Sequence, residues 1–112
     1  MSYEVMAVEY FRRRLKKLSK RYRRIGEDYK SLIETLESNP LTGDAIPGSG
    51  NRIYKIRMRS SNMKRGKRDG FRVIYYLSDH IVYLLTIYAK AKREEISVKE
   101  IKEALKGLDI TL

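Results

Sequence analysis

Basic side chains recur at every second position in one short segment of this 112-residue chain. The basic residues of the segment are Lys55, Arg57 and Arg59, and the residues that alternate with them are Tyr54, Ile56 and Met58. A β-strand sends successive side chains to opposite faces of a sheet, so this pattern predicts a strand with one apolar and one cationic face. A second predicted strand, Phe71 to Leu77, adds Arg72 to the cationic face. An anionic partner is favoured there, because a cation that is buried without one loses its hydration.

The overall charge indicates the same class of partner. The sequence holds 25 Lys and Arg against 14 Asp and Glu, which gives a net charge of +11. That balance is typical of nucleic-acid-binding proteins, although a solvated basic surface would produce it too. The absence of cysteine excludes disulfides and thiol chemistry. We find no signal-peptide pattern and no apolar run of the roughly 18 residues that span a bilayer. We therefore expect a cytoplasmic protein with no membrane partner.

The rest of the sequence predicts the elements that position these two strands. Residues 2–8 form a short apolar run that is typical of a strand. From Tyr10 onward an apolar residue returns every three or four positions, which predicts a basic amphipathic helix. A helix of this kind can lie on a membrane, but we favour packing on the sheet. A second helix is expected after an interruption at Gly26 and should end at Asn39-Pro40. Residues 39–51 predict an irregular connection and a candidate mobile binding loop.

The last third of the chain completes the predicted fold. Residues 81–88 are apolar on both faces, which indicates a central strand. Ser97, with Glu100 three residues later, predicts the N-cap of a final helix that ends at Leu105. The predicted order is therefore strand, helix, helix, three strands, helix. We expect an α+β fold in a single domain over residues 1–112, with a small antiparallel-rich sheet of about four strands and two N-terminal helices on one face.

This order leaves the other face of the sheet partly open, and the cationic row falls on that face. A single RNA strand suits such a surface, because its backbone needs cations and its splayed bases stack on aromatic rings. Tyr76 or Tyr88 is expected at the rim. The sole histidine, His80, falls in a turn remote from the row, where we expect it at the surface. No residues have the spacing of metal ligands, so no metal and no cofactor are expected.

Several short motifs, taken in order, resemble the RelE/ParE toxin superfamily, and especially its RelE and HigB-like branch of mRNA interferases. They are NPLTG at residues 39–43, the strand pair YKIRMR and FRVIYY, the turn GKRDG at residues 66–70 and the segment IYAKAKREEIS near the end. The resemblance covers almost the whole chain. It implies the toxin of a type II toxin–antitoxin pair, which acts as a metal-independent endoribonuclease. Such a toxin enters the ribosomal A site, cuts mRNA and inhibits translation, and its partners are a cognate antitoxin, the ribosome and mRNA.

The resemblance also implies catalytic roles for the residues at matching positions, Lys55, Arg57 and Arg72. In metal-independent cleavage the 2′-hydroxyl of the RNA attacks the neighbouring phosphate, which requires a proton acceptor, a proton donor and charge stabilisation. The planar guanidinium of Arg72 suits two phosphate oxygens. A crowded cationic site makes a lysine easier to deprotonate, so Lys55 is the candidate proton acceptor. Further RNA-binding residues are expected around this site: Arg59, Lys64, Arg65, Lys67, Arg68, Tyr88, Lys90 and Lys92.

One departure from the family leaves alternatives open. Some relatives place a histidine, an acid or a tyrosine near the end of the last strand or in the final helix, and where some carry a functional tyrosine this chain has Ser97. One alternative is a ParE-like toxin, which shares the fold and poisons DNA gyrase by binding. Another is a non-catalytic RNA-binding module. The long basic hairpin and the set of Lys55, Arg57 and Arg72 favour the endoribonuclease.

Overall fold

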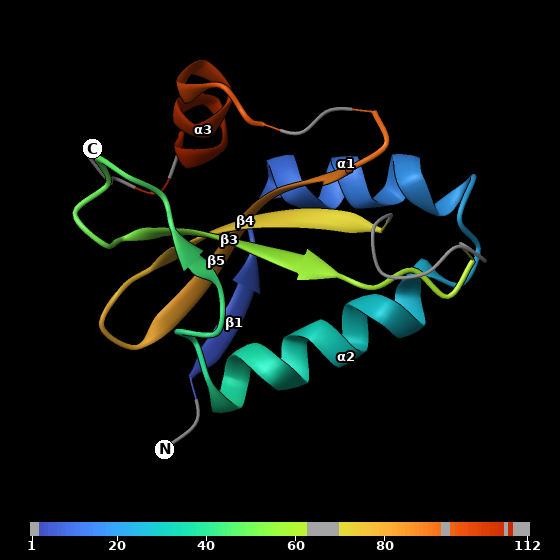
Figure 1. Cartoon of the computed structure of the whole chain (residues 1–112), viewed down its shortest axis with the longest axis horizontal. Coiled ribbons are helices and arrows are strands. Elements are labelled where there is room, and N and C mark those ends of the chain that lie inside the picture. Colours follow the sequence, from blue (N-terminus) through green and yellow to red (C-terminus); the bar gives the residue numbers. More distant parts are fainter. Residues whose placement is uncertain (1–2, 63–69, 93–94, 107, 109–112) are drawn as a thin grey trace.

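The protein is described by a computed structural model that covers residues 3–62, 70–92, 95–106 and 108. The elements follow one another in the order β1 (Glu4–Ala7), α1 (Glu9–Ser19), α2 (Ile25–Ser38), β2 (Asp44–Ala45), β3 (Ile53–Met58), β4 (Phe71–Leu77), β5 (Ile81–Ala89) and α3 (Val98–Leu105) (Figure 1). The α+β prediction and the predicted order of elements are confirmed. The addition is β2, a very short strand within the segment that we expected to be irregular.

The strands form one mixed sheet in the order β1-β5-β4-β3-β2. The strand pairs β2–β3, β3–β4 and β4–β5 are antiparallel, whereas β1 pairs with β5 in parallel. The predicted central position of residues 81–88 is thus confirmed, since β5 lies between β1 and β4. A register shift between Ile74 and Tyr75 on β4 marks a bulge in the pairing with β5. The sheet therefore has five strands where about four were expected.

The two faces of the sheet bury separate hydrophobic clusters. The first cluster contains α1 and α2 residues such as Phe11 and Leu36, together with the apolar sides of the strand pair. Its strand members include Tyr54, Ile56, Met58, Phe71, Val73 and Tyr75. This is the face that we predicted the two N-terminal helices to cover. The alternating pattern of β3 and β4 was therefore a sound guide to which side chains are buried.

The second cluster lies on the opposite face, under α3. Ile101, Ala104 and Leu105 of this helix pack with Ile53, Ile74, Leu85 and Tyr88 of the sheet. Figure 1 shows the sheet between α2 on one side and α3 on the other. We expected this face to be partly open, and α3 covers part of it. An apolar stripe on α3 needs burial, and the apolar residues beside the cations provide the surface for it.

The boundary between the first two helices differs from the prediction. Gly26 lies inside α2, and the chain leaves helical structure earlier, between α1 and the Arg24 N-cap. Glycine lowers helix stability by only about 1 kcal/mol, and a buried neighbour such as Ile25 can offset that cost. At the other end of the chain, the predicted N-cap of α3 is confirmed. The Ser97 hydroxyl oxygen accepts a hydrogen bond from the Glu100 backbone N–H at 3.1 Å.

The segment before β3 is anchored to the core by Tyr75. The Tyr75 hydroxyl donates to the Pro40 carbonyl at 2.7 Å and accepts from the Gly43 N–H at 3.1 Å. Its ring stacks on Tyr54, with centroids 5.3 Å apart. A Cβ on Gly43 would lie 2.8 Å from the Tyr75 hydroxyl, so the close approach requires glycine. Residues 40–45 are thus fixed in position, which places β2 at the edge of β3.

Candidate functional site

Arg57 and Arg72 lie directly opposite each other on neighbouring strands. The pairing of β3 with β4 makes their Cα atoms partners, and both side chains belong to the face that carries α3. Arg57 is exposed and Arg72 is half-buried. Like charges directly across an antiparallel pair repel each other by a few tenths of a kcal/mol. A bound anion between the two guanidinium groups would remove that repulsion and gain charge-assisted hydrogen bonds.

Lys55 lies in the neighbouring row of the same face. Its strand partners are Ile74 on β4 and Asp44 on β2. The row continues to Thr86 on β5, whose hydroxyl donates to a Glu100 carboxylate oxygen of α3 at 3.1 Å. The structure thus brings Lys55, Arg57 and Arg72 together, as the sequence predicted. Because the acidic Asp44 lies opposite it, Lys55 is not in the purely cationic site that we expected.

A groove of about 740 Å³ runs between α2 and the edge of β3. On the strand side it is lined by consecutive residues at the edge and end of β3: Lys55, Ile56, Arg57, Met58 and Arg59. On the helix side it is lined by polar and charged residues: Arg24, Glu27, Asp28, Ser31 and Thr35. The groove is open along β3 beyond the short β2. Lys55 and Arg57 thus border both this groove and the face on which Arg57 lies opposite Arg72.

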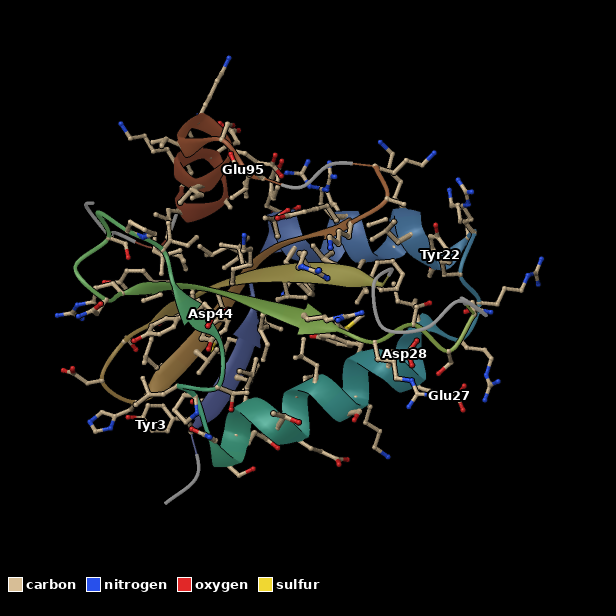
Figure 2. All side chains as sticks on the ribbon, in the orientation of Figure 1. Tyr3, Tyr22, Glu27, Asp28, Asp44 and Glu95 are labelled. Carbon is tan, nitrogen blue, oxygen red and sulfur yellow. The ribbon has the colours of Figure 1, made fainter. Side chains whose placement is uncertain are left out.

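The start of α2 holds the end of the β3 strand in place. Asp28 accepts hydrogen bonds from the backbone N–H of Ser61 at 2.9 Å and from its hydroxyl at 2.5 Å. The backbone N–H of Arg24 donates to the Asn62 side chain at 2.8 Å. Figure 2 shows Asp28 and Glu27 at this end of α2, beside the segment that follows β3. These bonds fix the path of the chain where it leaves β3, next to Arg57 and Arg59.

The return of the chain into β4 depends on a glycine. Gly70 has a φ of +114°, and a Cβ there would lie 2.9 Å from the Met58 carbonyl oxygen. Any other residue would be strained by both its backbone conformation and this contact. Gly70 immediately precedes Phe71, which is fully buried and packs edge-on against Tyr22 at 5.0 Å. These contacts set the position of Arg72.

The remaining predicted RNA-binding residues differ in their surroundings. Tyr88 is only 2% exposed and packs in the cluster under α3, so the prediction of an aromatic rim at Tyr88 is wrong. Its Cα partner on β4 is Arg72, so it forms part of the floor beneath the cations. Lys90 is half-buried and Lys92 is exposed, after the end of β5. The hairpin residues Lys64, Arg65, Lys67 and Arg68 lie outside the described residues.

Two carboxylates near Lys55 were missed by the sequence analysis. Asp44 is its cross-strand partner, and Glu95 joins Asp44 and Lys55 in lining a second hollow of about 420 Å³. Figure 2 shows Asp44 on β2 and Glu95 beside α3. Neither acid has a sequence signal, because their position depends on the path of the chain through two irregular segments. They supply negative charge beside an otherwise basic surface.

The other predictions for this region concern His80, metals and membranes. His80 lies in the turn between β4 and β5 and is exposed, as predicted. Among the described residues no three His, Cys, Asp or Glu side chains gather into a possible metal site. None of the helices in the described ranges is long and apolar enough to cross a bilayer.

Comparison with known proteins identifies the fold. No family model matches the sequence. Among solved structures, the chain is similar to the Escherichia coli toxin RelE, in a free-state structure of a double arginine-to-alanine mutant. The two share 22% sequence identity over 95% of this chain and 97% of that one, with a TM-score of 0.62. The chain therefore has a RelE-like fold.

Proposed function

Because this chain has a RelE-like fold, we propose that it is the toxin of a type II toxin–antitoxin pair and acts as an mRNA interferase. It would cut messenger RNA in the ribosomal A site and so inhibit translation. The observation that carries the proposal is the direct opposition of Arg57 and Arg72 across β3 and β4. Two guanidinium groups in this arrangement can hold one phosphate from both sides.

The proposed reaction uses the 2′-hydroxyl of the RNA as the nucleophile. The 2′-oxygen attacks the adjacent phosphorus, and the bond to the 5′-oxygen of the next nucleotide breaks. That oxygen takes up a proton from water and becomes a 5′-hydroxyl, while a 2′,3′-cyclic phosphate remains on the upstream fragment. Negative charge grows on the phosphate oxygens during this step. Arg57 and Arg72 stabilise that charge, and donors preorganised for the transition state typically contribute about 10²- to 10³-fold each.

Lys55 is the proposed proton acceptor for the 2′-hydroxyl. The lysine must be neutral before this step, and it becomes an ammonium when it takes up the proton. Arg59 and Lys92, both exposed, and Lys90 extend the basic surface along the RNA. We expect the hairpin cations Lys64, Arg65, Lys67 and Arg68 to bind RNA phosphates as well.

The ribosome supplies the orientation that the protein alone does not impose. In-line attack requires the 2′-oxygen, phosphorus and 5′-oxygen to be aligned, and that alignment is worth several kcal/mol of barrier. The buried Tyr88 is not placed to stack on an RNA base. We therefore propose that mRNA held in the A site is cut and that free RNA is bound but cut poorly.

The proposed partner is a cognate antitoxin that covers or displaces part of the basic surface in the cytoplasm. A net charge of +11 favours an acidic helix or extended segment in that partner. The groove between α2 and β3, with Lys55, Arg57 and Arg59 on its wall, is a suitable place for such a segment. Binding there would block access to the phosphate site.

The test is cleavage of a reporter mRNA in a translation extract, after the cut site has been mapped. A reporter with a single 2′-deoxynucleotide immediately upstream of the scissile phosphate should resist cleavage. The matched control carries the 2′-deoxynucleotide one position further upstream and should be cut normally. The fragments should end in a 2′,3′-cyclic phosphate and a 5′-hydroxyl.

Two results would overturn the proposal. Equal cutting of both reporters would exclude attack by the 2′-hydroxyl. Inhibition of DNA gyrase in a supercoiling assay, with no cleavage of ribosome-bound mRNA, would assign the chain to a ParE-like activity instead.

A further inference from the structure

Almost the entire net charge of the protein resides in one short segment. Residues 10–24 contain nine Lys and Arg and no Asp or Glu. The rest of the sequence holds 16 Lys and Arg against 14 Asp and Glu, so this segment contributes nine of the eleven net positive charges. It comprises most of α1 and the connection to α2. The segment contains neither Arg57 nor Arg72, the two arginines of the proposed phosphate site.

The basic side chains of α1 face solvent while its apolar stripe is buried. Phe11 is fully buried, and Leu15 and Leu18 pack against the same cluster under α1 and α2. Arg13, Lys16, Lys17 and Lys20 are exposed. In the described part of the chain, no hydrogen bond or ion pair engages these four side chains. Their charges are therefore available to a partner.

These cations line a hollow between α1 and α3. The hollow measures about 630 Å³. Its lining residues are Tyr10, Arg13, Arg14, Lys16, Lys17, Lys20 and Glu103. Glu103 forms an ion pair with Lys106 at 3.0 Å, which offsets its negative charge. Arg13 to Lys20 spans about 10 Å along the helix axis at ~1.5 Å per residue. That length is enough to contact more than one phosphate of a nucleic-acid backbone.

The chemistry of this surface favours the backbone of base-paired RNA. Single strands are held by aromatic stacking as well as by charge, and the aromatic ring in the lining, Tyr10, packs against the cluster under α3. A membrane surface would need exposed apolar residues on the helix. Among the described residues, the exposed large hydrophobic side chains are Met6, Leu41 and Val98, all outside α1. Charge without stacking or insertion is the mode in which proteins bind duplex phosphates.

We propose that the exposed face of α1, centred on Arg13, Lys16, Lys17 and Lys20, is a second RNA-binding surface that holds the phosphate backbone of a base-paired RNA. It lies apart from the Arg57–Arg72 site and does not depend on cleavage there. If the proposed function also holds, a double-helical part of ribosomal RNA is the class of ligand available to this surface. The toxin would then be docked by one surface while the other cuts mRNA.

The experiment measures binding of a blunt 16-base-pair RNA hairpin as salt is varied. The test variant is Lys16→Ala, Lys17→Ala, Lys20→Ala, and the matched control is Lys30→Ala, Lys99→Ala, Lys102→Ala, which removes three exposed helical lysines elsewhere. Each lost phosphate contact lowers the slope of log affinity against log salt by about 1. We expect the slope to fall by about 2 to 3 in the test variant and by less than about 1 in the control.

Lysine acetylation and binding to lipid vesicles test the same inference independently. Acetylation of the parent protein should be slowed by the duplex at Lys16, Lys17 and Lys20 but not at Lys30, Lys99 or Lys102, and this needs no variant to fold. Equal slopes for both triple variants, or binding to anionic phospholipid vesicles without binding to the hairpin, would overturn the inference. Loss of hairpin binding by the test variant supports it even if the parent never cuts mRNA, so its failure is distinct from that of the proposed function.

Discussion

β3 and β4 form two cross-strand pairs that differ in almost every physical respect. Tyr54 and Tyr75 stack in the core, with their rings tilted by only 11° and exposed by 7% and 0%. Arg57 and Arg72 face each other on the opposite side of the same strands, where like charges repel. The aromatic pair buries its rings and stabilises the fold, whereas charged side chains that are at least partly exposed typically contribute little to stability. Stability and proposed activity should therefore respond to different substitutions.

Removal of the Tyr75 hydroxyl is expected to have the larger effect on stability. In Tyr75→Phe the ring still stacks on Tyr54, but the Pro40 carbonyl loses its donor and the Gly43 N–H loses its acceptor. A buried polar group left without a partner costs about 1–3 kcal/mol. We expect the free energy of unfolding in urea to fall by that amount.

The matched control for this prediction is Tyr83→Phe. Tyr83 is half-buried on the other face, where its ring lies 6.5 Å from that of Tyr76, and in the described part of the chain its hydroxyl has no hydrogen-bond partner. This variant should change stability by less than about 0.5 kcal/mol. Equal losses in the two variants would show that the Tyr75 hydrogen bonds do not anchor the segment before β3.

A smaller effect is expected at alkaline pH. The pKa of Tyr75 is raised to about 12, chiefly by burial; the Gly43 hydrogen bond lowers it, and Tyr54 and Asp44 contribute to the rise. The folded state therefore keeps this proton at pH values where the unfolded chain, with a tyrosine pKa near 10, has lost it. The contribution is fully present below about pH 10 and is lost as pH rises toward about 12.

This dependence can be measured by comparing the parent with Tyr75→Phe in urea at pH 9 and pH 11. The parent should lose more unfolding free energy than the variant over this interval. Burial also raises the pKa of Tyr29, but that residue titrates in both proteins and cancels in the difference. Identical losses in parent and variant would contradict the assigned role of Tyr75.

The sequence predicted the two strands and their faces because alternation is a local signal. Tyr54 and Arg57 could be assigned to opposite faces from their spacing alone. The burial of Tyr88 could not be foreseen, because it depends on where α3 packs after an irregular segment. The same limit applies to Asp44, which lies opposite Lys55 in the β2–β3 pairing, after a segment that is anchored to Tyr75 at Pro40 and Gly43. The predicted helix interruption at Gly26 was wrong, because α2 begins at Ile25 and burial of Ile25 offsets the low helix propensity of glycine.

The central claim is that the Arg57–Arg72 pair serves phosphate chemistry and not stability. Its most direct test measures mRNA cleavage in a translation extract and urea unfolding on the same preparation of Arg72→Ala. The matched control is Arg52→Ala, an exposed arginine just before β3. Arg72→Ala should cut about 10²- to 10³-fold more slowly than the parent, with an unfolding free energy within about 0.5 kcal/mol of it or higher. Cleavage by folded Arg72→Ala at the rate of the parent and of Arg52→Ala would contradict the account.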